Sequence, residues 1–454
     1  MKSRWILGLL VLGFGLNAQV PADWEAKLES IVQDAGTFGK ANGGMIMKVY
    51  VPGEWEWSGA EGYAQTDITA TGDMQFRVGS ISKMFTAAAI LKLQDQNRLS
   101  IDDSISNYIR PSLLVVDSIT YGDQMTILQL LNHTSGMGNA SANQTCQVQA
   151  LSNLEAETTY EEAIACGNEV GPYGQPGEVF TYSNNNYTVL AMIIEEVTGQ
   201  PFDTYMNDSI IAPLGLSNTY IPTTNEIQTP HMGCYWQQMF TTYDMTIVHP
   251  SLYRGWASIV STTSDLITFY EKLRNGEIIS SQSWDLMQTI VSPSSYYGLG
   301  LEQFSYYSTP YKGHAGEVGN TSGLYFCDVS TACAPNGFYV SYNINYAREV
   351  DFVNEIDRPL VSAFKSCLVG VEEETSIAFD YQISNGQLQI QLDQNLSSGA
   401  RLRMYQINGA LLHEEMIEMN QASIGLNQFP SGVYLVNLQT TEGQKNIKLN
   451  WLKN

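Results

Sequence analysis

Ser80 and Lys83 are the first residues of this chain whose types and spacing could do chemistry. They lie three residues apart, at the end of a strand-like stretch and the start of an expected helix over 82–96. Residues at this spacing share a helix face, so the serine hydroxyl and the lysine amine can meet. A lysine removed from water has a lowered pKa and can accept the serine proton, and the N-terminal end of a helix favours negative charge on the serine oxygen. The pair predicts a serine nucleophile with a lysine base.

The same spacing occurs a second time. Ser362 and Lys365 also fit it, but they lie inside an expected closing helix over 351–368, with no glycine or turn before them. Chance produces roughly one or two such matches in a chain of this length. We therefore interpret the second match as structural.

A second motif places Tyr182 two residues before Asn184, in a loop that contains Pro176 and Gly177. A tyrosine held near a lysine can relay a proton to a leaving group. The asparagine amide is both donor and acceptor, so it can contact a substrate carbonyl and the lysine together. We predict that Tyr182 is a second acid/base group and that Asn184 binds substrate.

A third motif covers residues 313–317, between two strand-like runs. A small residue such as Gly316 at a strand edge lets a substrate approach the backbone closely. The backbone N–H of Glu317 is expected to pair with that of Ser80 as an oxyanion hole, in which one donor contributes about 3–4 kcal/mol of transition-state stabilisation. His314 is expected to hydrogen-bond the tyrosine or the substrate.

Three further matches are interpreted as structural. Tyr205 and Asn207 lie on an expected helix, where packing is the more common role, and His231 lies in a proline-containing loop without a strand pattern. His133 precedes a loop, where a histidine is more often a hydrogen-bonded structural residue than a catalytic one.

The pattern of apolar residues predicts an α/β domain over residues 19–370. Strand patterns cluster at its two ends and helical patterns fill its middle, so we expect one sheet built from both ends with an inserted helical lobe. The expected strands include residues 44–51, 297–302, 323–329 and 338–346, and the expected helices include 24–32, 82–96, 185–197, 264–273 and 351–368.

Residues 376–454 change character and predict a second, all-β domain. Short alternating segments dominate, and the Asn-Gly pairs at 385–386 and 408–409 are typical of hairpin turns. The seven segments favour a small β-sandwich. Residues 371–375, which contain three consecutive glutamates, are the expected linker.

The charge balance argues against two classes of partner. The chain has 454 residues and a net charge of −24, from 22 Lys and Arg against 46 Asp and Glu. Neither nucleic-acid binding nor adsorption to anionic lipid is expected, because both need clustered positive charge. Hydrophobic residues make up 44% of the chain, which is enough for packed cores.

Residues 1–18 are expected to be a signal peptide. Lys2 and Arg4 give a basic start, residues 6–14 are largely apolar, and Ala18 is a small residue suited to cleavage. A membrane anchor needs about 20 apolar residues, and this run is about half that length. We expect an exported protein without a transmembrane segment after signal removal.

Six cysteines fit an oxidising compartment. Their spacing matches no metal motif, so no metal or organic cofactor is implied. Local loop closure favours the pairs Cys146–Cys166, Cys327–Cys333 and Cys234–Cys367, with buried thiols as the alternative.

With the three motifs in this order, residues 35–350 resemble the serine β-lactamase and penicillin-binding protein superfamily, nearest its class C β-lactamase and D-alanyl-D-alanine carboxypeptidase branch. Further matching segments are 130–137, 187–202, 213–216 and 261–266. The resemblance implies a mainly antiparallel sheet flanked by helices. It also implies that Ser80 is acylated, that Lys83 and Tyr182 share the proton transfers, and that His314 takes the place of the lysine of a K-T-G triad.

Two positions depart from the family pattern. Carboxypeptidase-like members tend to have a small hydroxyl residue at the position of Glu317, where it helps to bind a substrate carboxylate. A glutamate facing the pocket would repel that group, whereas strand alternation could turn the side chain outward. Trp256 stands where members often have small residues, and it either lines the pocket or packs in the core.

The predicted function is an exported serine hydrolase acting through an acyl-enzyme on an amide, peptide or β-lactam. One alternative is a carboxylesterase of the same fold. Another is a penicillin-binding sensor or surface binding protein that is acylated with little turnover.

The tail resembles the type IX secretion sorting domain of Bacteroidetes-type bacteria, through residues 402–409, 424–429, 431–436 and 445–451. This resemblance implies the type IX machinery as a partner. It also implies export through the periplasm of a Gram-negative bacterium to the medium or the cell surface. A binding module with the same β-sandwich fold is the alternative.

Overall fold

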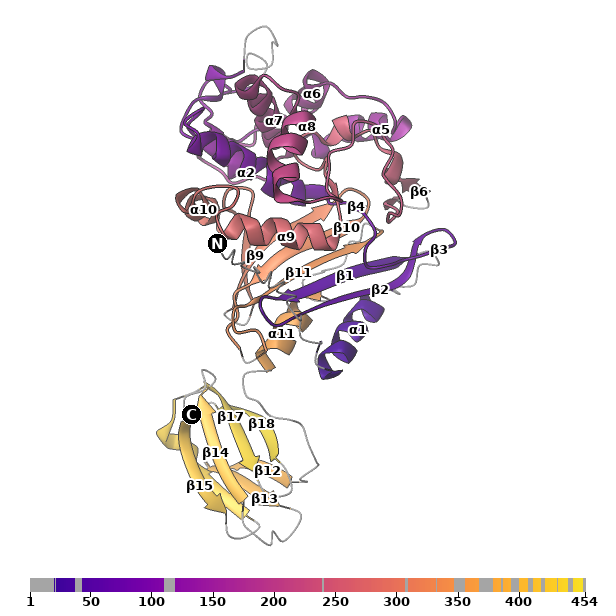
Figure 1. The fold of residues 1–454 in the computed structure, drawn as a ribbon. Helices are drawn as coiled ribbons and strands as arrows, with labels where there is room; N and C mark the ends of the chain where they lie inside the picture. Colours follow the sequence, from indigo (N-terminus) through magenta and orange to yellow (C-terminus); the bar gives the residue numbers. More distant parts are fainter. Residues whose placement is uncertain are drawn as a thin grey trace, which may run out of the picture. The chain divides into compact units, whose positions relative to one another are not determined.

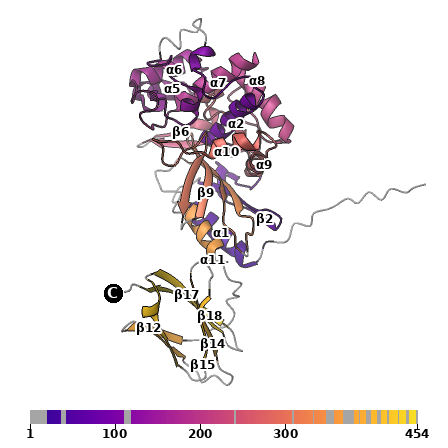
Figure 2. The ribbon, with the colours of Figure 1, turned by 90° about the vertical axis from the view of Figure 1, so that its left-hand side faces the viewer.

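The fold comes from a computed structural model of the chain (Figures 1 and 2). It describes residues 20, 22–36, 43–109, 119–238, 241–306, 309–331, 333–346 and 356–366, and in the tail 379–384, 387–392, 400–406, 411–417, 421–430, 432–439 and 444–451. The predicted signal peptide and the predicted linker at 371–375 lie outside the described residues. The chain divides into two compact units, one of residues 1–330 and 336–362 and one of residues 331–335 and 363–454.

The first unit contains a seven-stranded antiparallel sheet with the order β3-β2-β1-β11-β10-β9-β8. Strand β1 pairs with β2 on one side and with β11 on the other, so the two ends of the unit meet in the middle of the sheet. This confirms the expectation of one sheet built from both ends. The strands are β1 (Gly44–Val51), β2 (Trp55–Gln65), β3 (Ile68–Thr69), β8 (Glu302–Tyr306), β9 (Thr309–Glu317), β10 (Thr321–Cys327) and β11 (Phe338–Ile344).

Both faces of this sheet are covered. Every residue of β10 and β11 is buried, as expected for central strands with packing on both sides. Helix α1 (Ala22–Gly36) packs against β1 and β2, and α9 (Thr263–Arg274) packs against β1 and β11 (Figure 1). Tyr270 of α9 makes an edge contact with Tyr339 of β11, with ring centroids 5.7 Å apart.

The residues between β3 and β8 form the helical lobe. Its central helix α2 (Ser82–Asp95) is almost entirely buried, and Phe85 stacks on Phe269 of α9. Helix α7 packs against α2, α4 and α6. The other elements of this region are α4 (Ile127–Leu131), α5 (Gln144–Ser152), α6 (Tyr160–Val170), α7 (Asn184–Thr198), α8 (Phe202–Tyr205), α10 (Ser281–Gln288), and the short pairs β4 (Phe76–Arg77) with β7 (Val260–Ser261) and β5 (Tyr235–Gln238) with β6 (Thr241–Asp244).

One expected element differs in the structure. The strand expected at 297–302 is a turn, because the Gly298 N–H bonds the Leu301 carbonyl and Gly300 has a φ of +69°; the strand β8 begins only at Glu302. The closing helix α11 runs over Arg358–Ser366, and residues 351–355 and 367–368 of the expected helix lie outside the described residues. Ser362 of the second Ser-x-x-Lys match is exposed on this helix.

The disulfide predictions are right in one case and wrong in two. Cys146 and Cys166 are bonded, as expected. The pairs Cys327–Cys333 and Cys234–Cys367 are wrong, because Cys234 and Cys327 are buried thiols while Cys333 is disulfide-bonded. Cys234 is fully enclosed in an apolar cluster, and burial raises its pKa to about 12.

The second unit has two antiparallel sheets, of order β12-β13-β16 and β15-β14-β17-β18, which share one hydrophobic cluster. The seven strands within its described residues correspond to those that the alternating pattern predicts. They are β12 (Phe379–Ser384), β13 (Gln387–Leu392), β14 (Ala400–Gln406), β15 (Leu411–Ile417), β16 (Gln421–Gly425), β17 (Gly432–Gln439) and β18 (Gln444–Trp451). Within the described part of the chain, no helix combines the length and apolarity that a membrane span needs.

Candidate active site

Ser80 lies at the junction between the sheet and the lobe, on the short 3-10 helix Gly79–Ile81 that leads into α2. Gly79 has a φ of +58°, and a Cβ on it would lie 2.6 Å from the backbone nitrogen of Glu317. Only glycine allows this close approach, because other residues strain at positive φ and would collide with β9. The serine remains half-buried, so its hydroxyl is reachable.

Lys83 is fully buried in the first turn of α2. Its Nζ donates to Ser80 Oγ at 2.9 Å, to Asn184 Oδ1 at 2.8 Å and to the Trp256 carbonyl at 3.4 Å. Burial holds the pKa of this amine well below its usual 10.5, with a smaller opposing effect from Glu302. The site therefore holds an amine that loses its proton easily, directly beside a serine hydroxyl.

Tyr182 lies over the same amine. The Lys83 Nζ is 4.7 Å from the centroid of the Tyr182 ring, and the Ser80 side chain is near enough to affect the pKa of the phenol. Burial raises the pKa of the Tyr182 phenol well above 10, and the neighbouring Ser80 side chain only partly offsets this. The phenol is thus protonated near neutral pH and can donate.

Asn184 begins α7, one residue after the helix cap Ser183. Its Oδ1 accepts from Lys83, and its Nδ2 donates to Ser141 Oγ at 2.8 Å. The amide is therefore oriented with its acceptor toward the lysine and its donor toward the exposed Ser141.

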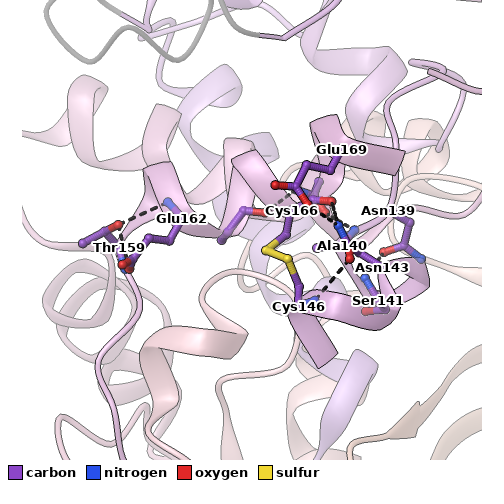
Figure 3. Close-up of a disulfide and its surroundings, with 11 residues drawn as sticks. Asn139, Ala140, Ser141, Asn143, Cys146, Thr159, Glu162, Cys166 and Glu169 are labelled. Carbon is purple, nitrogen blue, oxygen red and sulfur yellow. Dashed lines mark hydrogen bonds between the residues drawn. A yellow bond between two sulfur atoms is a disulfide. The ribbon is translucent and has the colours of Figure 1, made fainter. Parts of the chain in front are cut away.

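Ser141 is a site neighbour that sequence reasoning missed. It lies on the 3-10 helix Ala140–Ala142, just before the Cys146–Cys166 disulfide that ties α5 to α6 (Figure 3). Asn143 lies between the two features and donates from Nδ2 to the Cys166 carbonyl at 3.0 Å. No motif marks this serine, although its place shortly before a correctly predicted disulfide is a weak signal.

His314 is buried on β9. Its Nε2 lies 2.8 Å from the hydroxyl of Tyr297, and its Nδ1 lies 2.5 Å from the Ala315 carbonyl and 4.0 Å from Glu302 Oε1. The expected hydrogen bond to Tyr182 is therefore wrong, because Tyr297 takes this position and the Tyr182 ring centroid is 6.3 Å from that of the histidine. Burial lowers the pKa of His314, with Glu302 opposing and Lys83 adding to the shift.

Gly316 and Glu317 bring β9 against the serine. A Cβ on Gly316 would lie 2.0 Å from the Val78 carbonyl, so this glycine is required for contact between β9 and the segment before Ser80. The Glu317 side chain is exposed, yet its surroundings remove enough water to raise the pKa of its carboxyl. Strand alternation therefore turns this side chain out of the core.

The other matches behave as structural residues. Tyr205 is buried on α8, and Asn207 makes hydrogen bonds in both directions with the Ile221 backbone. The Gln65 amide nitrogen contacts both the imidazole and the backbone carbonyl of His231. Trp256 is half-buried with its ring 5.4 Å from Lys83 Nζ, so it lies beside the site. Within the described residues no cluster of His, Cys, Asp or Glu could hold a metal ion.

The antiparallel sheet with its inserted helical lobe defines a β-lactamase-like fold, and a family comparison agrees. Residues 28–349 match the model of the Beta-lactamase family, so the chain belongs to that family. Residues 384–450 match the Secretion system C-terminal sorting domain, which marks the chain for type IX secretion to the medium or the cell surface.

Individual proteins show how far the similarity extends. The chain is 31% identical over 228 residues to the "Putative penicillin-binding protein PbpX" of Bacillus subtilis (strain 168), which covers 50% of this chain and 53% of that protein. The chain thus spans about half the length of this curated relative. A D-stereospecific amidohydrolase from Streptomyces sp. superposes with a TM-score of 0.66 and 27% identity, over 74% of this chain and 98% of that one. A D-amino acid amidase from Ochrobactrum anthropi SV3 shares the fold, with a TM-score of 0.64 and 23% identity over 76% and 99% of the two chains.

Replacing Gly79 tests the contact between β9 and the serine. In Gly79→Ala the added Cβ strains the backbone and displaces Glu317, so the rate of Ser80 labelling by a fluorophosphonate probe should fall by about 10²-fold. Gly53→Ala is the matched control, because Gly53 also has a positive φ, of +79°, but nothing lies within 4 Å of its added Cβ. Equal labelling rates in the two variants would contradict the role given to this close approach.

Proposed function

We propose that this chain is an exported serine hydrolase that forms an acyl-enzyme on Ser80, with an amide, peptide or β-lactam as substrate. The observation that carries the proposal is the position of the Lys83 amine, which is buried and hydrogen-bonded to both Ser80 Oγ and Asn184 Oδ1. When neutral, the amine has two N–H donors, for Asn184 Oδ1 and the Trp256 carbonyl, and a lone pair that can take the Ser80 proton.

Acylation then follows from the donors around Ser80. Its proton passes to Lys83, with Tyr182 sharing the transfer, and its oxygen bonds to the substrate carbonyl carbon. The backbone N–H groups of Ser80 and Glu317 would stabilise the oxyanion. When the carbonyl re-forms, the bond to the leaving group breaks, and the leaving group takes a proton from Tyr182 or Lys83.

Deacylation reverses the roles. A water molecule gives a proton to the same pair of bases and attacks the ester carbonyl, and the Ser80 oxygen leaves with a proton returned to it. In this proposal Asn184 binds the substrate carbonyl through its Nδ2, in place of Ser141, while His314 and Gly316 form the strand edge along which the substrate lies. A chain that is acylated but fails at deacylation would be a penicillin-binding sensor.

The sorting domain supports the place of action. We propose that residues 1–18 direct the chain into the periplasm, that residues 19–370 carry the hydrolase, and that residues 376–454 are read by the type IX machinery. The substrate is then met in the medium or at the surface of a Gram-negative cell.

The substrate is proposed to lack a carboxylate next to the scissile bond. Although its side chain is turned out of the core, we place the Glu317 carboxyl near the leaving group, because the backbone nitrogen of this residue lies next to Gly79 and because loss of water raises the pKa of the carboxyl. A terminal carboxylate would be repelled there. The names of the structural relatives, a D-stereospecific amidohydrolase and a D-amino acid amidase, support an amide substrate. An ester is the competing substrate class for this fold.

Probe labelling tests the nucleophile. A fluorophosphonate probe and a fluorescent penicillin should label the wild type, and Ser80→Ala should abolish labelling because, in the part of the chain that the structure describes, Ser80 is the serine that the buried amine contacts. Ser362→Ala is the matched control for the second Ser-x-x-Lys spacing and should label as the wild type does. Labelling that persists in Ser80→Ala would refute the assignment, and labelling of the wild type without hydrolysis of p-nitrophenyl acetate or D-phenylalanine amide would favour the sensor.

The pH dependence tests the lysine base. Since only the neutral amine accepts a proton, the rate of Ser80 labelling should rise with pH and level off well below pH 10.5, because burial lowers the pKa of Lys83. Glu302 raises that pKa, so Glu302→Gln should move the midpoint to lower pH. The Tyr182 phenol should not reverse the rise below about pH 10, as its pKa lies well above its usual value. A flat profile, or a shift to higher pH in Glu302→Gln, would argue against Lys83 as the base.

Paired substrates test the role of Glu317. The wild type should hydrolyse acetyl-D-Ala-D-Ala amide faster than acetyl-D-Ala-D-Ala, by about three- to tenfold in kcat/KM for charges several ångströms apart near the surface. Glu317→Gln should narrow this ratio and Glu317→Asp should keep it. The same ratio in all three proteins would mean that this carboxyl does not face the leaving group.

A further inference from the structure

His133 is a buried histidine that the proposed reaction does not use. It follows α4 with a φ of +60°, a left-handed conformation that is uncommon outside glycine but is enriched for His and Asn. Its side chain is fully buried among aromatic rings, and its ring centroid lies 4.3 Å from that of Tyr182. A residue kept in this conformation at the edge of a site calls for a physical explanation.

The hydrogen bonds of His133 act on both neighbours of Tyr182. The backbone N–H of Thr181 donates to the His133 carbonyl at 3.0 Å, and the backbone N–H of Ser183 donates to His133 Nδ1 at 3.2 Å. The residue between these two is the tyrosine, whose ring lies against the imidazole. One histidine thus fixes the backbone on each side of Tyr182 and contacts its ring.

These bonds also determine which imidazole nitrogen carries the proton. A backbone N–H can only donate, so Nδ1 must be the unprotonated acceptor. The Asn186 amide approaches the same atom, with Nδ2 at 3.0 Å, and its Oδ1 accepts from Ser135 at 2.6 Å. The proton is therefore on Nε2, for which no hydrogen-bond partner occurs among the described residues.

The imidazole stays neutral in this environment. Burial lowers its pKa well below 6.5, and Lys83 and His314 add to the shift. With Nδ1 occupied by donors and Nε2 already protonated, the ring has no free lone pair with which to take a proton from Ser80 or a water. Its contribution must come from geometry.

We propose that His133 is a positioning residue that holds Tyr182 in place over Ser80 and Lys83 through its Nδ1 atom, its carbonyl and its ring. The proposal rests on the proposed function, because it assigns His133 a role only through Tyr182. The working atom is Nδ1, while Nε2 has no part in it. Because only one ring nitrogen is used, replacing His133 by asparagine and by glutamine tests the proposal.

Asn and Gln separate the two nitrogens. An asparagine places its Oδ1 near the Nδ1 position and tolerates positive φ, whereas a glutamine places its amide near the Nε2 position and leaves the Ser183 N–H without its acceptor. His133→Asn should keep the rate of Ser80 labelling by the fluorophosphonate probe within about tenfold of the wild type. His133→Gln should lower it by about 10²-fold, the effect of a displacement of about 1 Å. His231→Gln is the matched control, outside the site, and should label normally.

The dependence on Tyr182 distinguishes positioning from general destabilisation. In a Tyr182→Phe background, His133→Gln should cost little further activity, because the hydroxyl that it displaces is already absent. The midpoint of the pH profile should be the same in His133→Asn and the wild type, since this ring does not titrate. Circular dichroism and thermal unfolding of each variant establish that it is folded.

Three results would overturn the proposal. They are equal labelling rates in His133→Gln and His133→Asn, an undiminished effect of His133→Gln in the Tyr182→Phe background, and a shifted pH midpoint in His133→Asn. A wild type that is not labelled at Ser80 would instead refute the proposed function itself, so the two failures are distinguishable.

Discussion

The burial of one amine is the constraint on which this site depends. Lys83 lies in the interior with its Nζ held by the oxygens of Ser80, Asn184 and Trp256. Removing a charged ammonium from water is costly, so the protein favours the neutral form, and the neutral amine is the form able to accept a proton. The fold therefore keeps the amine unprotonated at a pH at which an exposed lysine would carry a charge, at some expense to stability.

The segments that form the site around this amine approach one another by different means. Gly79 and Gly316 allow two backbones to approach more closely than any side chain would permit. Asn184 contacts the Lys83 amine from the first residue of α7, and the packing of α7 against α2 fixes its position along α2. Since these segments are far apart in the chain, the site forms only when the sheet and the lobe are both folded.

The sequence was sufficient where chemistry and local pattern coincide. Ser80 with Lys83, and the tyrosine and asparagine at 182 and 184, are local patterns, and the structure brings them together. The seven tail strands followed from alternation of apolar residues, whereas the mainly antiparallel sheet followed from the resemblance to the family. The turn at 297–301 was missed because its apolar residues mimic a strand while Gly298 and Gly300 bend the chain.

Other features could not be read from the sequence because they depend on tertiary contacts. Glu302 lies 4.0 Å from His314 Nδ1 and Ser141 bonds the Asn184 amide, yet nothing in the local sequence of either residue marks it. The wrong cysteine pairs assumed that nearby thiols bond, whereas Cys234 is enclosed in an apolar cluster. His133 was correctly placed among hydrogen-bonded residues, but its relation to Tyr182 requires the folded backbone.

The disulfide between α5 and α6 bears on when, during export, the site becomes fully supported. Asn143 joins it to the 3-10 helix whose Ser141 hydroxyl orients the Asn184 amide (Figure 3). Cytosolic thiols remain reduced, and such bonds form after export. The newly made polypeptide would therefore lack the disulfide while it is in the cytoplasm. It would gain the disulfide only after crossing the inner membrane. If the proposed function holds, oxidation would act as a maturation step that delays hydrolysis until the chain has left the cytoplasm.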